Sequence, residues 1–236
     1  DLSALWALYR IFRIGGFASV HSVTPKAGLL SMMAARAAGV PLRLHTFTGQ
    51  VWATQNGPYR WLLKSLDKLT YLAASEVLVD SPSQRDFLIS EGVVRSNRAC
   101  VLAEGSISGV DLNRFVPSEQ ARIQVRAGYG LPMDAFVFLF VGRINRDKGV
   151  FELVRGFRQS DCAKNGAILM LVGPEEDDVL SQVDEDIACL GSSVVRVGFT
   201  DSPQDYMAAA DVFCLPSHRE GFGSVIIEAA ACGVPA

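Results

Sequence analysis

Two glutamates, Glu220 and Glu228, enclose the segment EGFGSVIIE at residues 220–228. Gly221 and Gly223 permit a tight turn there and expose backbone amides at the start of the helix that we expect to follow. Glu228 falls roughly one turn into that helix, where its carboxylate can reach a ribose diol lying over the helix start. Glu220 precedes the turn and can accept from sugar hydroxyls, because an ionised carboxylate only accepts hydrogen bonds. The alternative is a pair of helix-start and surface carboxylates that hold no ligand.

Positive charge gathers in a second segment, VGRINRDKG at residues 141–149. It follows a strand-like run and leads into a predicted helix, whose dipole disfavours cations at its N-terminus. A bound anion would resolve that conflict, because cations and helix amides together suit a diphosphate. The residues concerned are the cations Arg143, Arg146 and Lys148 and the bracketing glycines Gly142 and Gly149. The alternative is three cations that simply face solvent.

Together the two segments describe a nucleotide-sugar site, with a clamp for the diphosphate and carboxylates for the hydroxyls. No D-x-D is placed to hold a metal, so Arg143 and Lys148 would neutralise the leaving diphosphate. No G-x-G-x-x-G follows a strand, which disfavours a dinucleotide oxidoreductase, and no G-x-x-x-x-G-K-[ST] is present, which disfavours a P-loop nucleotidase. We expect no cofactor and no metal.

The elements that would position these residues alternate between strand-like and helix-like runs. Near-continuous apolar strands indicate parallel sheets covered by helices on both faces. The predicted strands are residues 18–23, 42–47, 76–79, 99–103, 135–141, 167–172, 194–198 and 211–216. The predicted helices are residues 2–13, 25–38, 59–74, 82–91, 149–159, 175–190, 204–210 and 224–231. The turn-rich stretch 105–117 predicts a linker between two α/β domains, at 1–117 and 118–236.

Composition narrows the class of protein. The 236 residues are 49% hydrophobic and carry a net charge of −3, which argues against general nucleic-acid binding. No run reaches the roughly 18 apolar residues of a spanning helix, no cleavable leader opens the chain, and the five cysteines are scattered. These features favour a cytoplasmic protein. The chain opens on a helix and stops at GVPA, where a further strand is expected, so we expect a chain truncated at both ends.

The two loops and the linker resemble glycosyltransferase family 4, the retaining enzymes with the GT-B fold. The resemblance covers nearly the whole chain and includes the frame of Glu220 and Glu228, the G-R-x4-K run at residues 142–148 and the linker GVDLNRFVP. HSVTPKAG, LHTFTGQVWAT and DSPSQRDFL look like the bacterial surface-polysaccharide branch, which includes acetamido-sugar transferases. The resemblance implies two Rossmann-like domains facing a cleft, each incomplete here: an acceptor-side domain and then a nucleotide-sugar domain.

The resemblance also assigns roles to residues. It implies that Glu228 holds the ribose, Glu220 the donor sugar, and Arg143 and Lys148 the diphosphate. The loop around Gly142 and the turn Gly221, Phe222 and Gly223 join the donor site, and the base lies near the strand end from Val197 to Phe199. His45 matches a histidine that faces the transferring sugar, although as a lone histidine it reads as a satisfied buried imidazole. The resemblance also favours same-face attack as the route to retention of configuration, since the sequence offers no obvious carboxylate nucleophile.

These roles describe an enzyme that moves a sugar, from a UDP-linked donor, to a lipid-linked or polysaccharide glycan. A nucleotide-sugar epimerase of the same fold and a non-catalytic binding fragment are the alternatives, and we expect this chain alone to be inactive.

Residues 1–75 hold eight Lys and Arg against two Asp and Glu. With Trp61, Lys64 and Lys68 along one flank of the helix at 59–74, they indicate peripheral contact with anionic lipid at the inner face of the membrane. An ordinary solvated helix is the alternative.

Overall fold

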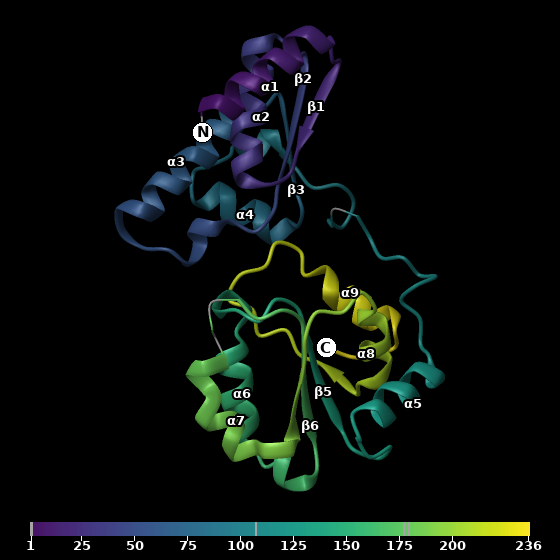
Figure 1. The fold of residues 1–236 in the computed structure, drawn as a ribbon. Helices are drawn as coiled ribbons and strands as arrows, with labels where there is room; N and C mark the ends of the chain where they lie inside the picture. Colours follow the sequence, from purple (N-terminus) through teal and green to yellow (C-terminus); the bar gives the residue numbers. More distant parts are fainter. Residues whose placement is uncertain (1, 107, 177, 179) are drawn as a thin grey trace. The chain divides into compact units, whose positions relative to one another are not determined.

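The computed structural model describes residues 2–106, 108–176, 178 and 180–236. The chain forms two compact units (Figure 1). The first unit comprises residues Asp1–Ser108 together with the short segment Arg219–Phe222, and the second comprises Gly109–His218 and Gly223–Ala236. This division falls after Ser108, within the predicted linker, whereas the sequence placed the boundary after residue 117. Residue 107 of that linker lies outside the described residues.

The first unit is a parallel sheet with strand order β1-β2-β3-β4. The strands are β1 (Ser19–Ser22), β2 (Leu42–Phe47), β3 (Glu76–Val79) and β4 (Ala99–Cys100), and the helices are α1 (Leu2–Gly15), α2 (Pro25–Ala38), α3 (Gly57–Ala73) and α4 (Pro82–Ser90). Local signals set the helix ends. In α2, Pro25 stands in the first turn and Gly39 ends the helix at φ +78, the left-handed region that glycine adopts most readily. The Ser81 hydroxyl caps α4 by accepting from the Gln84 backbone N–H at 3.2 Å.

The second unit is a parallel sheet in which strand order and chain order differ, β7-β6-β5-β8. Its strands are β5 (Val137–Val141), β6 (Ile168–Val172), β7 (Val194–Val197) and β8 (Val212–Phe213), and its helices are α5 (Glu119–Gly128), α6 (Val150–Gln159), α7 (Asp184–Leu190), α8 (Pro203–Ala209) and α9 (Ser224–Ala231). The chain leaves β5 for β6 on one side and returns to β8 on the other. That reversal is a topological switch point, where open α/β sheets bind their ligands.

Helices cover both faces of the second sheet, as its continuous apolar strands predict. Figure 1 shows α6 and α7 on one side of β5 and β6, and α5, α8 and α9 on the other. Alternate strand residues divide between two cores. Leu139 and Met170 pack in the core that includes residues of α8 and α9, whereas Phe140 and Leu169 pack in the core that includes residues of α6. All five residues of β6 are buried, so neither face of this strand meets water.

In the second unit one helix prediction is wrong and one helix was not predicted. The helix expected at 175–190 starts only at Asp184, after a 3-10 turn at Leu180–Val183. The first residues of the expected helix pair with another loop instead, because the Glu176 N–H donates to the Ile144 carbonyl at 2.9 Å. Residues 177 and 179 of that expectation lie outside the described residues. The sequence reading also missed α5, although Ser118 caps it by accepting from the Ala121 N–H at 3.2 Å.

The short strands also differ from expectation. The runs at 99–103 and 211–216 form two-residue strands only, β4 and β8. Each lies at an edge of its sheet, where only one neighbouring strand pairs with it. Across the part of the chain that the structure describes, no helix is both long enough and apolar enough to cross a membrane.

Candidate functional site

The two loops that the sequence singled out leave neighbouring strands of the second unit, because β5 pairs with β8. The His218 backbone N–H donates to the Asp147 carbonyl at 2.9 Å, which ties the cationic loop to the loop after β8. Gly149 lies at φ +69, and a Cβ on it would fall 2.0 Å from the Pro216 carbonyl oxygen. Only glycine fits there. The structure therefore places the two loops side by side at the carboxyl edge of one sheet.

The loop after β6 joins the same edge. Gly173 has φ +139, and a Cβ on it would lie 2.0 Å from the carbonyl oxygen of Gly142. The Gly173 N–H donates to the carbonyl of Val197 at 3.0 Å, which fixes the end of β7 beside it. Val197 is buried, whereas Phe199, two residues further on, is 72% exposed. An exposed aromatic side chain at this edge is suited to stacking on a planar ring.

Arg143, predicted as one arm of the diphosphate clamp, is already paired. Its Nη1 lies 3.1 Å from Oε2 of Glu176, and its side chain is 57% exposed. The Asn145 amide donates to the same carboxylate oxygen at 3.0 Å. That hydrogen bond, followed by the charge of Arg143, holds the pKa of Glu176 below its usual value. The sequence reading missed both Asn145 and Glu176, and the polar residue between two cations was the available signal.

The other two cations sit in a 3-10 turn, Arg146–Lys148, immediately before α6. Asn145 caps the turn, since its Oδ1 accepts from the Lys148 backbone N–H at 3.2 Å. Arg146 donates to the side chain of Gln182, and its guanidinium carbon lies 5.3 Å from the centre of the Phe151 ring. Lys148 is half-buried. The expected crowding of cations at a helix start is confirmed, but Arg143 and Arg146 each have a protein partner.

Glu228 lies in the second turn of α9 and is half-buried. Burial raises the pKa of its carboxyl, and the charge of Arg114 opposes that rise more weakly. Gly223 precedes the helix at φ +73, so the expected glycine turn is present. The placement of Glu228 one turn into a helix matches the prediction.

Glu220 groups with the first unit, so the structure assigns the two glutamates to different units. It is half-buried, as is Phe222. Next to it, the Gly221 carbonyl accepts from the Ser81 hydroxyl at 3.0 Å. A Cβ on Gly221 would lie 2.1 Å from Oδ2 of Asp80, so no side chain fits there. A shared ligand for Glu220 and Glu228 stays a prediction.

His45 ends up as a buried, bonded imidazole near the carboxyl end of β2. It is 2% exposed, and its Nδ1 lies 2.8 Å from the Ser22 hydroxyl. Burial, helped by the neighbouring His21, lowers the pKa of His45 to about 4. A Cβ on Gly28 would fall 2.4 Å from its Cε1, so the ring fills the space above that glycine. The imidazole is neutral at pH 7, and its contact with a transferring sugar stays a prediction.

The described part of the chain contains no group of three or more His, Cys, Asp and Glu side chains placed to hold a metal ion. The five cysteines are free thiols.

Comparison with protein-family models gives two matches that follow the two units. Residues 1–105 match the glycosyl transferase 4-like domain, and residues 121–236 match glycosyl transferases group 1.

Individual proteins agree. The chain is 30% identical over 236 residues to the capsular polysaccharide biosynthesis glycosyltransferase CapM of Staphylococcus aureus, covering 100% of this chain and 62% of that protein. It is 26% identical to the UDP-Gal:alpha-D-GlcNAc-diphosphoundecaprenol alpha-1,3-galactosyltransferase of Escherichia coli, covering 100% of this chain and 61% of that one. The chain thus spans about three fifths of these relatives.

The fold has solved counterparts. The crystal structure of Anabaena Alr3699/HepE in complex with UDP-glucose superposes with a TM-score of 0.80 at 21% identity, covering 98% of this chain and 61% of that one. With two parallel α/β sheets and a family model matched to each unit, the chain belongs to the glycosyltransferases of the GT-B fold, in the group that includes enzymes of bacterial polysaccharide synthesis.

Proposed function

We propose that the full-length protein transfers a sugar from a nucleoside diphosphate sugar, a UDP-sugar, to a glycan carried on a lipid. One observation carries the proposal: the cationic turn before α6 is tied to the loop after β8 at the topological switch point of the second sheet. Cations, helix-start amides and a nearby carboxylate at such a point match the parts of a sugar nucleotide. The uridine specificity draws support from the UDP-glucose in the structural neighbour.

Most of the groups proposed for the donor belong to the second unit, whereas Glu220, Gly221 and Phe222 belong to the segment that groups with the first unit. In this proposal, Lys148 and Arg143 stabilise the diphosphate as it departs, so the site's own cations balance the developing charge. Glu228 accepts from the ribose hydroxyls, and the uracil ring lies against Phe199 beyond the end of β7. The amides around Gly221, Phe222 and Gly223 line the phosphate side, and Glu220 binds the transferring sugar. No metal ion and no cofactor take part in this scheme.

Transfer with retention would proceed by attack on the face from which UDP leaves. The acceptor oxygen forms the new bond to the anomeric carbon while the bond from that carbon to the β-phosphate oxygen breaks. The acceptor's proton passes to that departing oxygen, and the electron pair of the broken bond stays on UDP. Neutral His45 would contribute a hydrogen bond to the sugar and not a charge. The name of the Escherichia coli relative, which acts on a diphosphoundecaprenol glycan, supports a lipid-linked acceptor.

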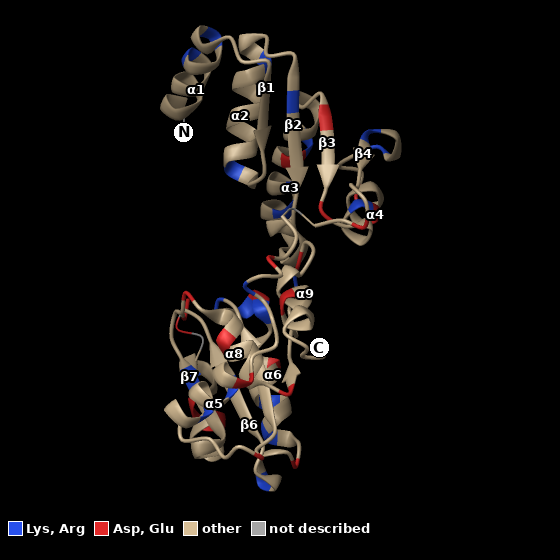
Figure 2. Cartoon of the chain, turned by 90° about the vertical axis from the view of Figure 1, so that its right-hand side faces the viewer, with Lys and Arg blue, Asp and Glu red and all other residues tan. Residues whose placement is uncertain are grey.

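We also infer peripheral contact with the cytoplasmic face of the membrane through α3. Trp61 is 70% exposed, and Leu62, Leu69 and Leu72 on the same helix are about half exposed. α1 and α2 carry blue residues and no red ones (Figure 2). On α3 itself, Arg60 and Lys64 both form ion pairs with Glu91, so part of the positive charge of this helix is already neutralised. Apolar insertion therefore contributes more than charge, and binding to anionic vesicles should weaken only in part as salt rises.

A single assay tests the proposed reaction. The full-length protein is incubated with sugar-labelled UDP-sugar and a polyprenyl diphosphate glycan. Label that moves to the lipid fraction supports the transferase. Interconversion of the nucleotide sugar, with no label on lipid, would replace it with an epimerase, and UDP-sugar binding without either reaction would leave a binding protein.

A further inference from the structure

Arg114 connects the linker to the loop that follows β7 in the second unit. Its Nε donates to the side-chain oxygen of Gln204 in α8 at 3.0 Å, and its Nη2 donates to the backbone carbonyl of Asp201. Asp201 belongs to the loop between β7 and α8, which also carries the exposed Phe199. The arginine therefore holds the loop that we propose to contact the base.

The position of Arg114 is itself fixed by a turn. The Asp111 carbonyl accepts from the backbone N–H groups of Arg114 at 3.1 Å and of Phe115 at 2.9 Å, and Oδ1 of Asp111 accepts from the Asn113 N–H at 2.9 Å. Phe115 is 7% exposed, and its ring centre lies 5.4 Å from the guanidinium carbon of Arg114. A side chain that is held in this way loses little further freedom in binding its partners.

Glu228 presents a half-buried carboxylate whose acceptor positions are open. Across the residues that the structure describes, no N–H or O–H group donates a hydrogen bond to it. Burial raises the pKa of this carboxyl, and the charge of Arg114 opposes that rise. Arg114 thus acts on Glu228 through its charge, while the hydrogen bonds that it donates go to α8 and to the loop before α8.

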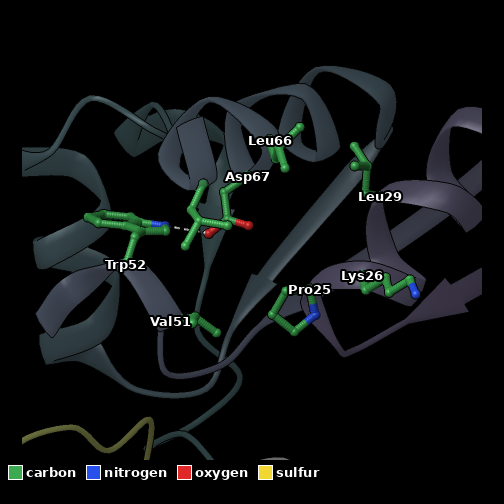
Figure 3. A pocket seen from close by; sticks show the side chains of 8 residues that line it. Pro25, Lys26, Leu29, Val51, Trp52, Leu66 and Asp67 are labelled. Carbon is green, nitrogen blue, oxygen red and sulfur yellow. Dashed lines mark hydrogen bonds between the residues drawn. The ribbon is translucent and has the colours of Figure 1, made fainter. Parts of the chain in front are cut away.

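Other carboxylates of the chain accept hydrogen bonds directly. Arg143 lies 3.1 Å from Oε2 of Glu176, and in the first unit the Trp52 indole donates to Oδ2 of Asp67 at 2.7 Å (Figure 3). Each of those contacts occupies an oxygen that a ligand would need. At Glu228 a positive charge favours the ionised form and the oxygens stay available, which is what binding a vicinal diol requires.

The other groups around Glu228 supply no positive charge. The charged and titratable side chains of the linker turn, the loop after β7, α8 and the end of α9, apart from Arg114 and Glu228, are Asp111, Asp201, Asp205, Tyr206 and Cys232. A hydrogen bond with Tyr129 raises the pKa of Tyr206 to about 12, and burial raises the pKa of Cys232, so both are uncharged at neutral pH. Within this set the three aspartates are negative and Arg114 alone is positive.

We propose that Arg114 is a positioning residue of the nucleoside site, which holds the loop after β7 in place for the base and keeps the Glu228 carboxylate available to the ribose hydroxyls. The inference rests on the donor site proposed above. One guanidinium has two separable effects there, because its hydrogen bonds hold the loop and its charge acts on the carboxylate.

Two variants of the full-length protein separate these effects. Arg114→Lys keeps the charge but loses the planar fork that bonds Gln204 and Asp201 together, whereas Arg114→Gln removes the charge and keeps an amide donor. Uridine is the probe, because it carries no phosphate that titrates in acid. The control ligand is 2′,3′-dideoxyuridine, which lacks the ribose hydroxyls. Affinities are measured by calorimetry from neutral pH into the acid range.

We expect uridine affinity in the parent protein to fall in acid as Glu228 takes up a proton, and dideoxyuridine affinity not to fall. Arg114→Lys should weaken uridine about fivefold at every pH, the worth of one hydrogen bond, without moving the fall. Arg114→Gln should move the fall to higher pH, because burial then raises the pKa of Glu228 unopposed. Arg196→Gln is the matched control, an exposed arginine on β7 that pairs with Asp184, and it should leave the fall in place.

A titration without ligand keeps this inference distinct from the donor site. The Glu228 carboxyl is followed by carbon-13 resonance and assigned with Glu228→Gln, and it should titrate at higher pH in Arg114→Gln than in the parent or in Arg196→Gln. An unmoved titration in Arg114→Gln, or an equal move in Arg196→Gln, overturns the role of Arg114 even where uridine and UDP bind. Failure of the parent protein to bind uridine and UDP would instead overturn the donor site, and this role with it, whatever the titration shows.

Discussion

The two units hold their ionisable groups in opposite ways. In the first unit, His45, Asp67 and Asp80 are buried, and burial is the main cause that moves each pKa toward the neutral form, to about 4, 6 and 6. In the second unit, the acids pair with arginines, as in Asp211 with Arg126 and Glu176 with Arg143, and their pKa values are lowered. The first unit desolvates these groups, whereas the second keeps its acids charged beside arginines.

That difference matches two kinds of partner. Charges that persist at pH 7 are useful against a diphosphate, whose own charge they offset. Buried polar groups suit hydroxyls, which need a matched donor or acceptor. The second sheet also has the topological switch point at β5 and β8, whereas the first runs β1 to β4 in chain order. The two sheets thus carry different electrostatic environments although their strands are parallel in both.

The paired charge of the second unit should show its largest effect at Arg126. This side chain is fully buried, bonds Asp211 at 2.8 Å, and donates to several backbone carbonyls, including that of Ala135 at 2.8 Å. We expect Arg126→Met to lower the free energy of unfolding by about 3–5 kcal/mol in urea titrations, because Asp211 loses its buried partner. Arg122→Met removes a partly exposed partner of the same carboxylate and should cost less. Equal losses for the two variants would contradict this account.

Burial of His45 in the first unit should make the stability of the protein depend on pH. Burial lowers the pKa of His45 to about 4 in the folded protein, from its ordinary value of 6.5. Between those values the unfolded chain binds the proton more readily, so the contribution of His45 grows as pH rises from 4 to 6.5 and is lost as pH falls. We expect the difference in unfolding free energy between the parent protein and His45→Gln to grow by about 3 kcal/mol over that window. A difference that does not vary with pH would refute the assignment.

Lys148 tests whether the charged edge holds a diphosphate. In the full-length enzyme, Lys148→Ala should weaken UDP by about 1.5–3 kcal/mol, the range for a charged hydrogen bond, and leave uridine almost unaffected. Calorimetry with both ligands measures the contrast. Lys164→Ala is the matched control, since that side chain is exposed and pairs with Asp161 at 2.8 Å. Equal losses for UDP and uridine would remove the diphosphate from this loop.

Substitutions of the two glutamates should have different effects, one on UDP affinity and the other on the rate of transfer. Glu228→Gln should weaken UDP by about 1 kcal/mol, because a neutral amide replaces the charged acceptor for the ribose hydroxyls. Glu220→Gln should leave UDP affinity nearly intact and lower kcat, since its contacts would strengthen during transfer. Calorimetry and transfer rates on each single mutant separate the two. Normal folding with both readouts unchanged would return these residues to surface carboxylates.

The substitution Glu176→Gln should have the smallest effect on UDP binding and the one that depends most on salt. Its carboxylate occupies Arg143 and lies where a diphosphate would bring more negative charge. Glu176→Gln should therefore strengthen UDP binding by about 0.5 kcal/mol at low salt, the scale of an exposed ion pair, and the gain should fade as salt rises. Weaker UDP binding in the variant would mean that Glu176 instead holds Arg143 in its working position.

Local sequence signals located most elements correctly. The bounds of α2, β2, β3 and α9 match the predictions residue for residue, because caps, glycines and apolar runs act over short distances. The two site loops were also recognisable, since charged residues beside glycines at the end of an apolar strand are uncommon in an ordinary turn. The helix at 175–190 failed because Pro174 and Glu176 pair with Ile144, which belongs to a distant part of the chain.

Tertiary structure alone decided how the ionisable groups behave. No pattern in LHTFTG shows that Ser22 and Gly28 close over His45, because Ser22 meets it only through the parallel pairing of β1 with β2. Nor does it show that burial lowers the pKa of His45. Asp67 reads as a polar residue on an amphipathic helix, yet the Trp52 turn buries it beside an apolar hollow. Burial and charge pairing depend on neighbours far apart in sequence, so the sequence specified which residues carry the chemistry and the fold set their protonation and partners.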